Sequence, residues 1–170
     1  FLVDFAKKQQ IRYIQDESNN IILFADGTCG LEGHEPVVLQ GHMDMVCEKD
    51  EGCPIDMDTQ GLDLCHDNLC VFAKGTTLGG DDGIAVAYAM ALIADRTIPH
   101  PPLEVIITVD EEVGMLGADV IDVSMLKGRK MINLDSEDEG IFTVACAGGA
   151  TATISLNVNR KAVYGPCVRL

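Results

Sequence analysis

Basic residues are scarce in this sequence of 170 residues. Lysine and arginine together number 12, against 27 aspartates and glutamates, so the formal net charge is −15. A charge of this size and sign repels phosphate backbones and anionic lipid. We therefore expect neither nucleic acid nor a membrane surface as a partner, and expect instead a protein that gathers carboxylates to hold cations.

The sequence also lacks a long apolar run. Its longest uncharged apolar stretch, residues 83–94, is too short to span a bilayer. Apolar residues nevertheless make up 47% of the chain, which is enough for the core of about one domain and excludes wholesale disorder. We expect the chain to be part of a longer polypeptide, because Phe1 and Leu2 begin an apolar helix face with nothing before it.

No Cys-x-x-Cys pair occurs among the seven cysteines. An odd number argues against a disulfide framework, so we expect reduced thiols and a cytoplasmic location. The spacings of Cys47 and Cys53, and of Cys65 and Cys70, leave a thiolate zinc site open. The simpler interpretation is that the cysteines are small, mostly buried hydrophobes.

The spacing of apolar residues predicts alternating helices and strands up to residue 135. Apolar positions 1, 2, 5 and 6 indicate an amphipathic helix, and the β-branched run at 103–109 indicates a buried strand. The alternation favours an α/β fold, a mixed sheet with helices on both faces. Helices are predicted at 1–10, 84–95, 113–120 and 124–126, and strands at 11–16, 20–24, 37–41, 62–65, 68–73, 103–109 and 131–134.

Two parts of the sequence carry further expectations. The helix at 84–95 is apolar on nearly all sides, so we expect it to be covered on most of them. Towards the C-terminus the pattern changes to strands alone, at 142–147 and 151–158. This change indicates that a second unit begins there, which divides the chain into domains at 1–148 and 149–170.

Acidic and imidazole side chains cluster at four places, three of them directly after predicted strands. In open α/β sheets, ligands bind at the carboxyl ends of the strands. Each cluster taken singly also fits an ordinary role, such as a helix N-cap or a solvated acidic turn. The four clusters are His42 with Asp44, Asp81 with Asp82, Asp110 with Glu111 and Glu112, and Asp135 with Glu137.

Taken together, the four clusters suit a divalent metal site with nitrogen and oxygen ligands. His42 and Asp44 stand two apart in an extended segment and point to the same face, so one can bind a metal while the other fixes the imidazole tautomer. The excess of carboxylates favours two metals, with one carboxylate left over as a base. Two noncatalytic functions remain open: a cation-buffering domain and an interaction module.

The sequence resembles the cytosolic aminoacyl-histidine (Xaa-His) dipeptidases, of the di-zinc aminoacylase and carboxypeptidase group of metallopeptidases. The His-x-Asp and Glu-Glu pairs are shared by the wide group. The Gly-Thr-Thr-Leu-Gly and Asp-Ser-Glu runs point to the dipeptidase branch. The matching blocks occur in order at residues 37–46, 75–83, 108–118, 133–140 and 146–149.

The resemblance implies a set of metal ligands. His42 and Asp135 correspond to ligands of one zinc, and Glu112 corresponds to a ligand of the other. Asp81 corresponds to the carboxylate that bridges both ions, in a peptide bond to Asp82 that is often cis in this group. Cobalt or manganese is an alternative to zinc, because imidazole and carboxylates accept all three.

The resemblance also implies a reaction, the hydrolysis of a dipeptide by a water molecule that bridges the two metals. Glu111 corresponds to the general base, and Asp44 corresponds to the carboxylate that orients His42. An aminoacylase or a tripeptidase of the same group remains the alternative.

Some parts that the resemblance implies are not in this sequence. The group has a further histidine ligand towards its C-terminus, and an inserted α+β lid domain that can dimerise and that would begin here at about residue 149. His34, His66 and His100 match no ligand position, and we interpret them as surface or structural residues. We therefore expect the isolated chain to be inactive and to hold at most one metal firmly.

Overall fold

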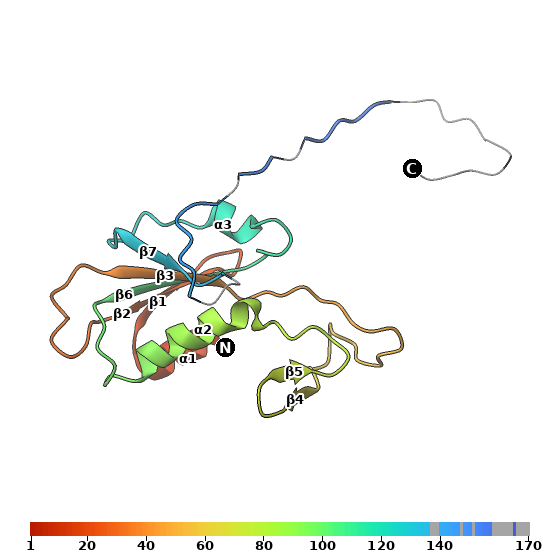
Figure 1. Cartoon of the computed structure of the whole chain (residues 1–170). Helices are drawn as coiled ribbons and strands as arrows, with labels where there is room; N and C mark the ends of the chain where they lie inside the picture. The colour runs from red at the N-terminus through yellow and green to blue at the C-terminus, as the bar shows by residue number, and fades with distance from the viewer. Residues whose placement is uncertain (137–139, 147, 151, 158–164, 166–170) are drawn as a thin grey trace. The chain divides into compact units, whose positions relative to one another are not determined.

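The computed structural model describes residues 1–136, 140–146, 148–150, 152–157 and 165. The chain separates into two units, residues 1–139 and residues 140–170. All helices and strands of the described residues lie in the first unit (Figure 1). The end of the Asp-Ser-Glu block, residues 137–139, lies outside the described residues.

A five-stranded mixed sheet forms the centre of the first unit (Figure 1). Its strands are β1 (Arg12–Gln15), β2 (Ile21–Ala25), β3 (Val37–His42), β6 (Leu103–Thr108) and β7 (Lys130–Asn133), in the spatial order β1-β2-β6-β3-β7. β2 pairs antiparallel with β1 and β6, whereas β3 pairs parallel with β6 and β7. The mixed sheet predicted from the sequence is confirmed.

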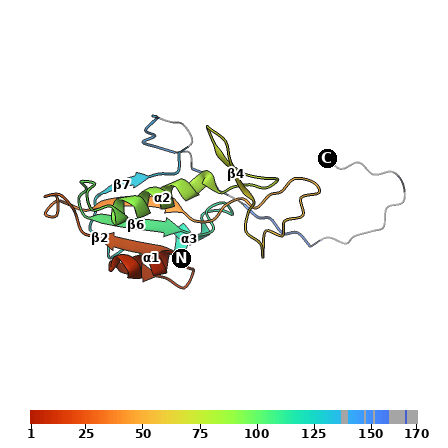
Figure 2. The ribbon, with the colours of Figure 1, turned by 90° about the horizontal axis from the view of Figure 1, so that it is seen from below.

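Helices cover both faces of this sheet, as predicted. α1 (Leu2–Gln9) and α2 (Gly80–Ala94) lie on one face (Figures 1 and 2), where their small and aliphatic residues pack against β2, β3 and β6. α3 (Leu116–Val120) lies on the opposite face (Figure 1), and the segment after it packs there on a second apolar cluster. The core is therefore divided into two layers by the sheet.

α2 leaves much of its apolar surface exposed, so the expectation that it is covered on most sides is wrong for this chain. Ala85, Ala89 and Ile93 are buried against the sheet, whereas Ile84 and Tyr88 are 50% and 57% exposed. The helix contacts the sheet through one stripe of its surface, and the residues on its outer side remain in contact with solvent.

A small hairpin stands away from the sheet (Figures 1 and 2). It consists of β4 (Leu64–His66) and β5 (Val71–Ala73), which pair antiparallel. Leu64, Val71 and Phe72 are largely exposed, so the hairpin adds little to the core.

The cysteines differ from the expectation that most of them are buried. Cys53 and Cys65 are partly buried, and the other described cysteines, Cys29, Cys47, Cys70 and Cys146, are exposed free thiols. They lie in loops, at the hairpin and in the second unit, where little apolar surface is available to bury them.

Three further predicted elements do not form in the described residues. Residues 124–126 make a single turn, closed by a hydrogen bond from the Leu126 N–H to the Val123 carbonyl, instead of a helix. Residues 142–146 and 152–157 form no strand, and Phe142, Val144 and Ile154 are more than four-fifths exposed. A strand needs a paired neighbour, and these segments have none among the described residues; residues 147, 151 and 158 lie outside them.

No helix among the described residues is long and apolar enough to cross a membrane.

Candidate metal centre

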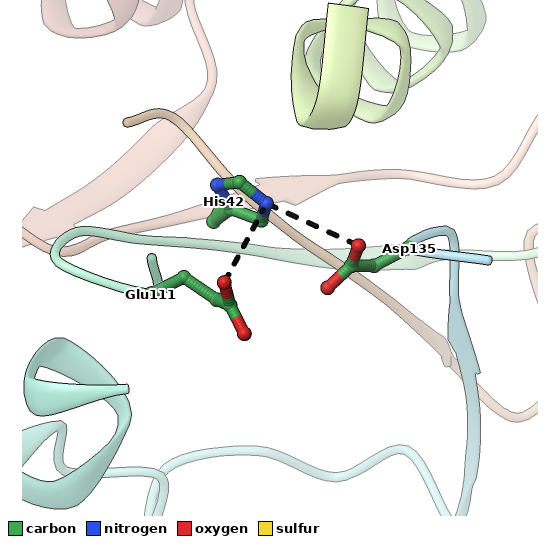
Figure 3. Close-up of side chains that lie close together, drawn as sticks. All are labelled: His42, Glu111 and Asp135. Carbon is green, nitrogen blue, oxygen red and sulfur yellow. Dashed lines mark ion pairs between the residues drawn. The ribbon is translucent and has the colours of Figure 1, made fainter. Parts of the chain in front are cut away.

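Three predicted site residues come from the carboxyl ends of neighbouring parallel strands. His42 ends β3, while Glu111 and Asp135 follow shortly after β6 and β7. Because these strands are adjacent and parallel, their ends meet at one edge of the sheet. Figure 3 shows the three side chains turned toward one another at that edge.

The imidazole of His42 is 1% exposed and is surrounded by carboxylates. Its Nε2 lies 3.1 Å from Oδ1 of Asp81, 3.9 Å from Oδ1 of Asp135 and 4.0 Å from Oε2 of Glu111. Its Nδ1 lies 3.0 Å from the backbone oxygen of Asp44 and 3.4 Å from Oδ1 of the same residue. An Nδ1–H that donates to Asp44 leaves the lone pair of Nε2 facing the acidic cluster.

Asp81 and Asp82 reach the site from the start of α2 instead of from a strand end. Both residues have non-helical backbone angles, and the peptide bond between them is cis, as the resemblance implies. The Asp81 carboxylate contacts the His42 imidazole, and Oδ2 of the buried Asp82 accepts a hydrogen bond from the His42 N–H at 3.1 Å. The pair therefore contacts both the side chain and the backbone of His42.

Gly41 allows this close approach of α2 to β3. A Cβ at this position would collide with Oδ2 of Asp82 and with the side chain of Ala85. The sequence marks Asp82 only as an acidic neighbour of Asp81.

Asp44 joins the end of β3 to the loop that follows β6. Its Oδ1 accepts a hydrogen bond from the N–H of Glu111 at 3.1 Å, and its Oδ2 accepts one from the N–H of Glu112 at 3.2 Å. Asp44 therefore contacts His42 on one side and the backbone of the Glu-Glu pair on the other.

The donor atoms fall into two groups of three that are compact enough to hold a metal ion. One group is His42, Glu111 and Asp135, the other is His42, Asp81 and Glu112, and the donor atoms of each group lie within 4.8 Å of one another. Imidazole and carboxylate ligands fit zinc and related divalent ions. The structure thus brings together all four predicted ligands and Glu111, and it also places Glu111 within reach as a ligand.

The pKa values at the site reflect crowded negative charge and burial. Burial raises the pKa of Asp82 to about 6. Burial and the charge of Asp135 raise the pKa of Glu111. Burial by itself lowers the pKa of His42, but the hydrogen bond to Asp81 and the nearby carboxylates outweigh burial and raise it overall. A bound cation would counteract the repulsion between these carboxylates.

The remaining histidines lie in settings that agree with surface or structural roles. His34 and His66 are exposed. His100 is buried, its N–H donates to Thr28 Oγ1, and its Nδ1 lies 2.7 Å from the Pro101 carbonyl oxygen.

The chain belongs to peptidase family M20/M25/M40, whose family model matches residues 38–155. It is 40% identical over 163 residues to the cytosol non-specific dipeptidase of Escherichia coli (strain K12), an alignment that covers 96% of this chain and 34% of that protein. The chain therefore spans about a third of the length of this relative.

Solved structures support the same grouping. The aminoacylhistidine dipeptidase of Vibrio alginolyticus superposes with a TM-score of 0.77 at 40% identity, covering 82% of this chain and 28% of that one. A tripeptidase from Staphylococcus aureus superposes with a TM-score of 0.63 at 21% identity, covering 81% of this chain and 37% of that one, which is a likeness of fold.

Proposed function

We propose that the protein containing this chain is a metal-dependent dipeptidase that hydrolyses dipeptides, including those of the Xaa-His type. The observation that carries the proposal is the convergence of carboxylates on the buried imidazole of His42 at the carboxyl edge of the sheet. Membership of the peptidase family and the likeness to two dipeptidases support it.

In this proposal, His42 and Asp135 would hold one divalent ion, Glu112 would hold a second, and Asp81 would be a ligand of both. When bound, the ions supply Lewis acidity that polarises the peptide carbonyl and makes water more acidic. Zinc fits this donor set, as do cobalt and manganese. Asp44 keeps the imidazole of His42 oriented through its contacts with Nδ1.

Glu111 acts as the general base in this proposal. Its carboxylate takes a proton from the attacking water and then gives it to the amine that leaves, so that one side chain serves both halves of the reaction. The raised pKa of Glu111 supports the role, because burial and the charge of Asp135 make its carboxylate a stronger base than an exposed one.

Several properties of the whole protein complete the proposal. Residues from 149 onward begin a lid domain through which two copies can dimerise, and the protein works in the cytoplasm. The six described cysteines, all free thiols, support a reducing compartment. The isolated chain is expected to be inactive, because it spans about a third of its relative.

Peptidase assays on the full-length protein test the function. Stripping the protein with a chelator is expected to abolish the hydrolysis of dipeptides. Reloading with zinc, cobalt or manganese is expected to restore it. Tripeptides and N-acyl amino acids in the same panel test the alternatives. Preferred cleavage of either of those substrates over every dipeptide would contradict the proposal.

A pair of variants tests the roles of the adjacent glutamates. Glu111→Gln is expected to retain bound metal and to lower turnover by roughly 10²- to 10⁴-fold, because the base is lost while the ligands remain. Glu112→Gln is expected to lower the metal content measured by mass spectrometry of the purified protein. Equal metal loss in both variants would show that Glu111 is a ligand, which its distance from His42 also permits.

A further inference from the structure

Asn20 is a buried polar residue far in sequence from every residue of the metal centre. It directly precedes β2, is 1% exposed, and has its side-chain amide fully engaged. Its Oδ1 accepts a hydrogen bond from the N–H of Val109 at 3.0 Å. Its Nδ2 donates to the carbonyl of Gly117 at 2.9 Å and to Oδ2 of Asp16 at 2.7 Å.

Val109 and Gly117 are the two ends of the loop that carries the Glu-Glu pair. They also bond to each other, since the N–H of Gly117 donates to the Val109 carbonyl at 3.1 Å. Asn20 therefore contacts both ends of the loop at the point where the loop closes. A Cβ on Gly117 would collide with the Val109 carbonyl and with Oδ1 of Asn20, so the glycine makes room for this contact.

The surroundings of Asn20 determine which way its amide points. The amino group faces two acceptors, the Asp16 carboxylate and the Gly117 carbonyl, whereas the oxygen faces a donor. The flipped amide would put an oxygen against two acceptors and an amino group against an N–H. Asp16 also accepts the backbone N–H of Asn20 at 2.9 Å, which ties the amide to the β1–β2 turn.

Two side chains thus hold the same loop at different places. Asp44 accepts the backbone N–H groups of Glu111 and Glu112 in the loop itself, and Asn20 bonds its two ends. We propose that Asn20 is a positioning residue, which closes the loop at residues 109–117 and thereby places the Glu111 carboxylate beside His42. This inference rests on the proposed function, in which Glu111 is the general base.

Asn20→Ala in the metal-loaded full-length protein tests the inference. The loop is expected to open at its ends, so that kcat on dipeptides falls roughly 10- to 100-fold, as expected for a misplaced catalytic group, while KM is unchanged. Hydrogen exchange is expected to accelerate in the amides of residues 110–117 and not in β3 or α2.

Ile93→Val is the matched control. Ile93 is a buried residue of α2 that packs in the core on the face of α1 and α2, and the substitution shortens its side chain. It is expected to lower global stability without changing kcat. Asn20→Ser is the second variant: it removes the amide donor to Gly117 without setting a second carboxylate beside Asp16, and it decides the matter where Asn20→Ala fails to fold.

The outcomes separate this inference from the proposed function. Unchanged kcat in the folded Asn20 variants, or exchange that accelerates equally throughout the sheet, would overturn the positioning role. Failure of the unmodified protein to cleave any peptide would instead overturn the proposed function. In that case the exchange rates of the loop amides still report whether Asn20 closes the loop.

Discussion

At the scale of the residue, Asp82 shows how a carboxylate can shape a site through the backbone. It is buried beneath the end of β3 and accepts the N–H of His42, while the neighbouring Asp81 contacts the imidazole. A charged carboxylate at such a position is costly, and burial accordingly raises its pKa from its ordinary value of 3.8 to about 6.

The raised pKa of Asp82 predicts a pH dependence of stability in the metal-free protein. The folded state binds the Asp82 proton more tightly than the unfolded state does, so this contribution to stability is full below about pH 4 and is lost as pH rises through about 6. The side-chain amide that Asp82→Asn introduces does not titrate. The variant is therefore expected to gain about 2–3 kcal/mol relative to the unmodified protein between pH 4 and pH 7.

Urea unfolding of both metal-free proteins at the two pH values measures this difference. Comparing the two proteins cancels the titration of groups that they share. A difference in unfolding free energy that stays constant from pH 4 to pH 7 would show that the pKa of Asp82 is not raised.

At the scale of the element, the contact between β3 and α2 depends on how closely they approach. Gly41 lies under Asp82 and Ala85, and these contacts leave no space for a further carbon atom. This close approach brings the Asp81 carboxylate of the helix against the imidazole of His42, at the end of the strand. The spacing of these two elements is therefore part of the metal centre.

Gly41→Ala is expected to destabilise the fold by about 1–3 kcal/mol, since the added methyl group overpacks the contact between β3 and α2. Gly83→Ala is the matched control on the same helix, because a Cβ there meets nothing within 4 Å. The control is expected to change stability by less than about 1 kcal/mol, because Gly83 begins the regular part of the helix. Thermal or urea unfolding measures both changes, and equal effects of the two substitutions would contradict the overpacking account.

Some of these elements could be predicted from the sequence, because their patterns are local. The apolar run before His42 and the β-branched run before Glu111 identify β3 and β6, and the rule for parallel strand ends then places their polar residues together. The contact of Asp82 with the His42 backbone could not be predicted, because it depends on how α2 is set against β3.

Other features escaped prediction because they depend on partners distant in the sequence. Asn20 fits a turn residue locally, and its contacts with Val109 and Gly117 appear only once β2 lies beside β6. Ile84 and Tyr88 lie in an apolar stretch that predicts burial, but whether they are buried depends on what packs on the outer side of α2. Local periodicity carries no information about either.

At the scale of the whole molecule, the chain gathers acidic side chains at the ends of neighbouring strands and spans about a third of the length of its relative. The two donor groups share His42, so the described residues offer a single imidazole to both. We propose that a histidine from elsewhere in the full-length protein completes the second ion's ligands. Metal binding is therefore to be measured on the full-length protein.

Anomalous diffraction from crystals of the zinc-loaded full-length protein would locate the bound metals directly. Two zinc peaks are expected roughly 3.5–4 Å apart, as in other paired metal sites, with one beside His42 and Asp135, the other beside Glu112, and Asp81 between them. A single peak, or zinc bound away from His42, would contradict the assignment of this cluster as a two-metal peptidase centre.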